Sequence, residues 1–120
     1  MPKEVNNAYG SIILSEEVIA TIAGVAATEC YGIVGMASSR VADGIAELLG
    51  RENLAKGADV TLGEEDVSIT LNVIVGYGTR ISEVARNVIE KVKYTVETTT
   101  GLKVSRIRIN IQGVKVGKTR

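Results

Sequence analysis

A glycine-rich turn that runs into a basic residue is the first place where this sequence could hold a ligand. Gly76, Gly78, Thr79 and Arg80 stand between an apolar run and an amphipathic segment, where a helix is expected to begin. Free backbone N–H groups at a helix start, together with an arginine, can hold an anion. A full dinucleotide fingerprint would need a third glycine and a following acidic residue, and neither is present. The alternative is a strand-to-helix turn whose glycines serve the backbone conformation.

Two further features carry reactive groups, and each has a plain structural explanation. Glu64, Glu65 and Asp66 offer oxygen ligands to a hard cation, but they lack the spaced Asp/Asn and Gly pattern of a calcium loop. We therefore interpret them as a solvated hairpin tip. Cys30 is the one thiol in a chain that has no histidine to activate it, so we interpret it as a small buried hydrophobic residue.

The composition excludes several classes of chemistry. Without histidine and with one cysteine in 120 residues, the chain cannot build Ser-His-Asp or Cys-His nucleophiles, histidine zinc sites, an internal disulfide or a cysteine metal cage. We therefore expect a protein that is not an enzyme and has no catalytic residue, cofactor or metal. Fourteen basic residues balance fourteen acidic ones, so no net field draws the chain to nucleic acid or to an anionic membrane, and self-association meets little charge repulsion.

No segment of the sequence is suited to entering a membrane. The N-terminus, MPKEVNNAYG, has no apolar run of the signal-peptide type. The longest apolar stretch, residues 18–27, is interrupted by Thr21 and Gly24 and is far shorter than the ~20 residues that a span needs. We expect a soluble cytoplasmic protein without direct membrane insertion.

The longest amphipathic segment organises the expected fold. Apolar residues recur at three- and four-residue steps from Ile81 to Val96, which predicts a helix that Thr79 caps and Gly101 ends in a left-handed turn. The period then changes to two. Isoleucines alternate with polar residues over residues 106–112, which predicts a strand with one buried face.

The rest of the chain supplies shorter elements of both kinds. We expect a strand at 9–14, a helix that Ser15 caps and Gly32 ends, a strand at 33–36, a short helix within 38–50, a polar connection at 51–57, and a hairpin of strands 58–62 and 67–75. Because the strands have one polar face, both main helices should cover the same face of the sheet.

The predicted fold is therefore α+β and has two layers. It combines a mixed or antiparallel sheet of about four to five strands with two main helices on one face. The expected order is strand, helix, strand, short helix, hairpin, helix, strand. We expect residues 1–8 to be a flexible lead, 9–114 to be a single domain and 115–120 to be a basic tail.

The polar sheet face and the short helix are the candidate interaction surfaces. The residues that should share this face are Thr70, Asn72, Arg106, Arg108 and Asn110. Sheets that bind RNA stack bases on aromatic side chains, and this face has none. A protein-binding or self-pairing face and an ordinary solvated face both fit the pattern. The short helix could cover one end of the core, or it could present Ile45 and Leu49 to a partner.

Three ordered segments carry a family resemblance. Residues 10–23, GSIILSEEVIATIA, resemble the pattern G-x-I-x-I-S-x-x-V-I-x-x-I-A, and residues 26–36, AATECYGIVGM, are similar to A-x-E-V-x-G-V-x-G-M. The third comprises Tyr77-Gly78 with Ile81, Glu83 and Val84, then Thr100-Gly101-Leu102, Val104 and residues 111–114. Together they resemble the alkaline shock protein (twenty-three) family, the small general-stress proteins of Gram-positive bacteria. Cys30-Tyr31 stands where the family usually has an aliphatic-polar pair, and residues 38–57 carry nothing over.

The resemblance implies a small α+β domain in the cytoplasm with a role in cell-envelope homeostasis under stress. Some members of the family are held at the membrane by a separate anchor protein and self-associate there, and no enzymatic activity or cofactor is attached to the family. The resulting hypothesis is a non-enzymatic, self-associating scaffold or adaptor for a membrane-proximal partner such as a small membrane-anchor protein. The alternative is a nucleic-acid-binding domain that uses the polar sheet face and the basic residues Lys115, Lys118 and Arg120, with salt-dependent binding.

Overall fold

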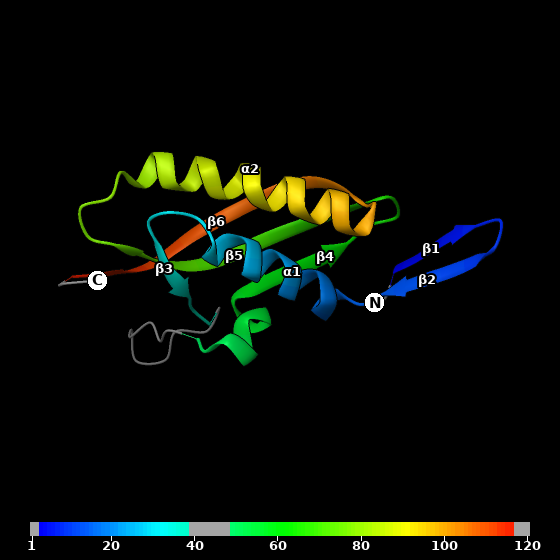
Figure 1. Ribbon diagram of the computed structural model, residues 1–120, viewed down its shortest axis with the longest axis horizontal. Helices are drawn as coiled ribbons and strands as arrows, with labels where there is room; N and C mark the ends of the chain where they lie inside the picture. Colours follow the sequence, from blue (N-terminus) through cyan, green and yellow to red (C-terminus); the bar gives the residue numbers. More distant parts are fainter. Residues whose placement is uncertain (1–2, 39–48, 117–120) are drawn as a thin grey trace.

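The computed structural model describes residues 3–38 and 49–116, and they form two layers with an arm at one end (Figure 1). Helices α1 (Glu16–Thr28) and α2 (Ile81–Thr100) lie on one face of a four-stranded sheet. The arm is a separate two-stranded hairpin of β1 (Lys3–Asn7) and β2 (Gly10–Leu14). It lengthens the molecule, whose principal extents are 53 × 28 × 22 Å.

The long strand β5 (Asp66–Gly76) is the centre of the four-stranded sheet. Along one edge of β5, two antiparallel strands follow one another, β4 (Ala58–Leu62) and β3 (Ile33–Met36). Along its other edge runs β6 (Lys103–Lys115), which is parallel to β5 and follows α2 in the chain. The mixed sheet with both helices on one face confirms the predicted α+β, two-layer fold.

The core between the two layers is aliphatic. From β5 it receives side chains that are at most 1% exposed, those of Val67, Ile69, Leu71, Val73 and Val75. From α2 it receives Val84, Val88, Val92 and Val96. The stripe of α1 consists mainly of small residues, Ile19, Ala20, Ala23, Gly24, Ala26 and Ala27. Small side chains on α1 allow its backbone to approach the sheet and the neighbouring 3₁₀ helix closely.

Two segments expected to be a lead and a connection contain secondary structure. The lead expected to be flexible contains β1, which pairs with β2 in a register that runs from Lys3↔Leu14 to Asn7↔Gly10. The segment expected to be a polar connection is the 3₁₀ helix η2 (Arg51–Gly57), because Leu54 is buried against Gly24 of α1. Of the short helix expected within 38–50, residues 39–48 lie outside the described part of the chain.

The helix ends agree with the sequence at two of the four positions tested. The Ser15 hydroxyl accepts a hydrogen bond from the Val18 N–H at 3.2 Å, as a cap should, and Gly101 ends α2 with φ +79°. Gly32 adopts a positive φ but does not end α1, whose C-cap is Glu29; it lies in the turn that follows the helix. Thr79, however, is not the cap of α2. The N-cap is Arg80, and the Thr79 hydroxyl instead donates to the Gly76 carbonyl at 2.8 Å.

Gly32 and Gly78 form a matched pair for a test of this packing. Their φ angles are +92° and +93°, yet a Cβ on Gly32 would lie 2.5 Å from Val84 Cγ2, whereas one on Gly78 would meet nothing within 4 Å. Val84 is β-branched and buried, so it cannot rotate away freely. Gly78→Ala should cost about 1–2 kcal/mol from backbone strain alone, and Gly32→Ala should cost clearly more. Urea denaturation of both variants measures the difference, and equal losses would contradict the packing of Gly32 on α2.

The carboxylate of Glu97 ties the end of α2 to the start of β6. It accepts a hydrogen bond from the Val104 N–H at 3.0 Å and another from Lys93 Nζ at 3.1 Å. These bonds, first the one from the Val104 backbone, lower the pKa of Glu97 from its ordinary value of 4.5. A carboxyl whose pKa is lower in the folded than in the unfolded protein stabilises the fold above the unfolded value. This stabilisation is lost as the pH falls through the folded pKa.

Replacement of Glu97 should therefore matter at neutral pH and much less in acid. Glu97→Gln should lower the urea midpoint at pH ~7, and its difference from the unmodified protein should shrink as the pH falls below 4.5. Glu90→Gln, which removes a carboxylate from the same helix without touching β6, is the control. A Glu97→Gln deficit that stays constant from pH ~7 to ~3 would show that the charge plays no part.

Candidate functional site

The glycine turn lies at the C-terminal ends of β5 and β6, beside the start of α2. It borders a hollow of about 320 Å³ that is lined by Tyr31, Gly32, Ile33, Val34, Gly76, Tyr77, Thr79 and Lys115. Several backbone N–H groups of the turn are used within the protein: Gly76 donates to the Gly32 carbonyl at 3.0 Å and Tyr77 to the Lys115 carbonyl at 2.9 Å. These bonds support the interpretation that the glycines serve the backbone. An anion at Gly76, Gly78, Thr79 and Arg80 stays a prediction.

The acidic turn and the thiol lie in different surroundings. Glu64, Glu65 and Asp66 lie at the tip between β4 and β5, where the Gly63 N–H donates to the Asp66 carbonyl at 2.8 Å. Nowhere in the described chain do three His, Cys, Asp or Glu residues gather closely enough to hold a metal ion. Cys30 is partly buried, and that burial raises the pKa of its thiol. A raised pKa reduces the thiolate fraction at neutral pH and hence the nucleophilicity of Cys30.

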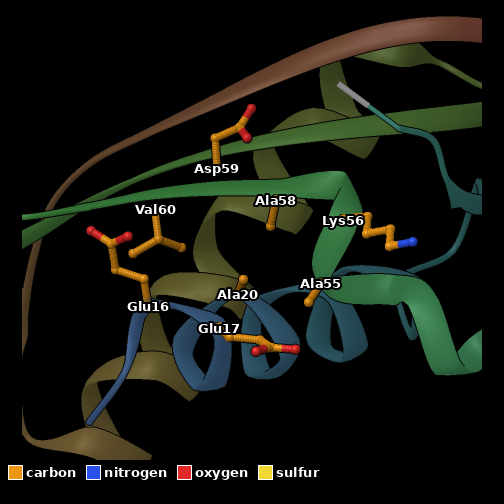
Figure 2. Close-up of a pocket in the computed structure, with 8 residues that line it drawn as sticks. All are labelled: Glu16, Glu17, Ala20, Ala55, Lys56, Ala58, Asp59 and Val60. Atoms are coloured by element: carbon orange, nitrogen blue, oxygen red, sulfur yellow. The ribbon is translucent and has the colours of Figure 1, made fainter. Parts of the chain in front are cut away.

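A hollow of about 350 Å³ separates the start of α1 from β4 (Figure 2). It exists because Ala20, Ala55 and Ala58 have small side chains. Figure 2 shows three carboxylates at its rim that point in different directions: Asp59 away from α1, Glu17 along the outside of the helix and Glu16 toward Val60. Carboxylates that diverge cannot share a proton or a cation, so this hollow has the form of a packing defect rather than a reactive site.

The polar residues predicted for one sheet face do meet there. The β5–β6 register places Ser68 beside Arg106, Thr70 beside Arg108 and Asn72 beside Asn110. A hollow of about 250 Å³ is lined by Thr61, Ser68, Ile69, Thr70, Arg106 and Arg108. We call this side, opposite the helices, the open face, defined by Thr61, Ser68, Thr70, Arg106 and Arg108. It presents two exposed guanidinium groups beside hydroxyls, which suits carboxylates or other anions of a partner.

Asn72 has a structural role that the sequence did not reveal. Its side chain is 1% exposed, and its Oδ1 accepts hydrogen bonds from Asn110 Nδ2 and Gln112 Nε2, each at 3.1 Å. Its Nδ2 donates to the Gly57 carbonyl at 3.2 Å. Asn72 thus connects β5 to β6 on one side and to the start of β4 on the other. Since its polar atoms are used within the fold, they are not available to a partner.

The short-helix surface is described only at its end. Ile45 lies outside the described residues. Leu49 is partly buried against the core, and its N–H donates to the Met36 carbonyl at 2.8 Å. The described part of this surface therefore covers one end of the core, which was one of the two interpretations of the sequence.

Sequence reasoning missed one surface altogether, the N-terminal hairpin. Ile12 and Ile13 of β2 are 57% and 65% exposed, and they point to opposite faces because they are consecutive in a strand. A signal for the hairpin was present. Asn7 and Gly10 are turn-forming residues on either side of a two-residue loop, although the loop itself lacks the usual glycine.

The network at Asn72 predicts a large effect from a substitution that preserves size. Asn72→Leu would leave the Gly57 carbonyl and two side-chain amides without their partner, which should cost about 1–3 kcal/mol of unfolding free energy. Thr70→Val, two residues away on the same strand, also replaces a polar side chain by an apolar one of similar size and should stay within about 0.5 kcal/mol. Urea denaturation distinguishes the two. Equal, small effects would mean that water replaces the amide of Asn72 without loss.

None of the helices described in this chain has the length and apolar character needed to cross a membrane. No solved structure matches the chain. It is 51% identical over 117 residues to the uncharacterized protein YloU of Bacillus subtilis (strain 168), covering 97% of this chain and 98% of that protein. It is 40% identical to the uncharacterized protein Spy1614 of Streptococcus pyogenes serotype M6, covering 97% of each. It is 34% identical to the uncharacterized protein YqhY of Bacillus subtilis, covering 88% and 78%.

A model of the alkaline shock protein (twenty-three) family, described by a "cell envelope-related function", matches residues 4–116. The matched residues include the whole four-stranded sheet, both main helices and nearly all of the hairpin. This match confirms the resemblance drawn from the three sequence segments. The chain therefore belongs to the alkaline shock protein (twenty-three) family, whose described function is related to the cell envelope.

Proposed function

We propose that this chain is a non-enzymatic general-stress protein that self-associates and acts as a scaffold or adaptor for a partner close to the membrane. The observation that carries the proposal is the family match over residues 4–116, with its cell envelope-related function. In this proposal the protein reaches the envelope by binding a partner protein. The affinity for that partner must then come from surfaces of this chain. The open face and the free edge of β6 are the surfaces best suited to this.

The chemistry of the described residues supports a binding role over a catalytic one. Active sites bring together ionisable groups whose pKa values are shifted for a reaction. Here the two clear shifts have structural causes: burial raises the pKa of Cys30, and the hydrogen bonds that hold β6 to α2 lower the pKa of Glu97. Carboxylates at the hollow beside α1 diverge. Of these groups, Glu97 ties α2 to β6, and none of them forms a nucleophile paired with a base.

Self-association is supported by charge and by the sheet edge. The formal net charge is zero at pH 7, so copies of the chain do not repel one another at long range. Strand β6 is thirteen residues long and pairs, among the described strands, with β5 alone. A long strand with an unpaired edge is a template for another strand.

A second candidate, nucleic-acid binding, draws on the two exposed arginines of the open face. Arg106 and Arg108 make no ion pair with another described residue. Two guanidinium groups without an aromatic platform would give weak binding that depends on phosphate contacts and falls steeply with salt. An absence of any mobility shift with RNA at low salt removes this candidate.

Sedimentation and membrane flotation together test the proposed function. Between roughly 1 and 100 µM, the range in which weak homo-oligomers form, the sedimentation coefficient should rise with concentration. The protein should float with native membrane vesicles of its host and not with protease-treated vesicles or pure lipid vesicles, because the binding partner is a protein. A monomer at every concentration that floats with none of the three contradicts the proposal, and flotation with pure lipid contradicts the need for a partner.

A further inference from the structure

The N-terminal hairpin has little support from the rest of the described chain. Its two strands form only five residue pairs, and an isolated hairpin of this kind is marginally stable in water without a third strand or a packed face. Leu14 at its base and Val5 in the middle of β1 pack against the core, whereas Ile12 and Ile13 on β2 are mostly exposed. The radius of gyration, 14.9 Å, exceeds the about 13.6 Å expected for a compact chain of this length. The hairpin is thus a projecting arm with exposed apolar side chains.

The same chain contains an open edge of matching length. Two bulges, at Ser105 and Gln112, bound a regular stretch of β6 in which six consecutive residues, from Arg106 to Ile111, pair with β5. A bulge bends the strand and interrupts its ladder, so a new strand can pair regularly only between the two bulges. Strand β1 has five residues and fits within this stretch.

The two faces of β6 match the two faces of β1. Ile107, Ile109 and Ile111 of β6 lie on the helix side and are only partly buried. Arg106 and Arg108 alternate with them on the open face and are exposed. In β1, Val5 lies on one face with its partner Ile12, whereas Glu4 and Asn6 lie on the other. When β1 is placed beside β6, Val5 and Ile12 extend the isoleucine face and Glu4 falls on the arginine face.

The alternative pairings match less well. Ile13 pairs with Glu4 and therefore shares the arginine face in either arrangement. With β1 at the edge, Glu4 lies between Ile13 and the arginines, whereas β2 at the edge would put Ile13 directly against them. Pairing of one hairpin with another would offer Glu4 a single cationic residue, because Lys3 is the one lysine or arginine in the sequence of the hairpin, whereas β6 offers two arginines. Charge and apolar pattern therefore both select the edge of β6 as the partner of β1.

We propose that β1 of one copy adds to the edge of β6 in a second copy, with Glu4 against Arg106 and Arg108. This inference rests on the proposed self-association and names the surface that performs it. Main-chain hydrogen bonds would supply the affinity and the alternating side chains the register. Because the arm and the edge are different surfaces, each copy that accepts an arm still presents its own. Contacts of this heterologous kind produce open chains or rings rather than closed dimers.

A charge exchange tests the contact. Glu4→Arg and the double substitution Arg106→Glu/Arg108→Glu should each weaken self-association, by about fivefold or more in apparent Kd, since each sets like charges against one another. An equimolar mixture of the two variants should assemble again, because the arm of each then meets an edge of opposite charge. Glu65→Arg, which reverses an acidic residue at the β4–β5 tip, is the control and should assemble like the unmodified protein.

Glu4→Arg could weaken assembly by disturbing the hairpin itself. Hydrogen exchange of the unmodified protein tests the contact without any substitution. In the unmodified protein, amides of residues 106–111 and of β1 should exchange more slowly at high than at low concentration. If the protein assembles but these amides do not respond and the mixture does not recover, the hairpin contact is wrong and self-association occurs elsewhere. If no variant, including the unmodified protein, assembles at any concentration, the proposed self-association fails as well.

Discussion

The burial of one face of β5 is the constraint on which the rest of this structure depends. Side chains at every second position from Val67 to Val75 are at most 1% exposed, and both helices are committed to covering them. Burying an aliphatic side chain releases roughly 1.5–3 kcal/mol, so this strand alone accounts for a large share of the apolar free energy. With both helices on one side, the opposite side of the sheet has to remain polar. The open face is thus a consequence of how the core is built.

The length of β5 also determines how its two edges are used. With eleven residues it is longer than β3 or β4, which share one edge and leave a junction between them. Asn72 lies at this junction. Its carbonyl accepts from the Ala37 N–H at 2.9 Å, and its side chain donates to the Gly57 carbonyl at 3.2 Å. The buried side-chain amide therefore satisfies the Gly57 carbonyl, a backbone group that a continuous strand would have paired, which explains why a polar residue is tolerated there.

Sequence periodicity was sufficient to identify the elements that form the core. Apolar residues recur at three- and four-residue steps in α2 and at alternate positions in β5 and β6. These patterns are clear because each element buries one face. Strand β1 escaped prediction because KEVNN has one apolar residue and acquires its pairing from β2. For the candidate site, the sequence predicted which residues share a face of the sheet. It did not predict what each of them does there. The sequence indicates that Asn72 shares a face with Arg108, but not that three partners would enclose it, since enclosure depends on where β3 and β4 end.

The arginines of β6 can both protect its edge and select what binds there. Charged side chains near an exposed edge discourage indiscriminate pairing, because an apolar strand would have to desolvate them. The same charges favour a strand whose carboxylate lies on the face that meets the arginines. One pair of residues can therefore both discourage most strands and attract a particular one. The bulges at Ser105 and Gln112 narrow the choice further, since they limit regular pairing to a short strand. An edge built in this way can remain open on a neutral protein without promoting general aggregation.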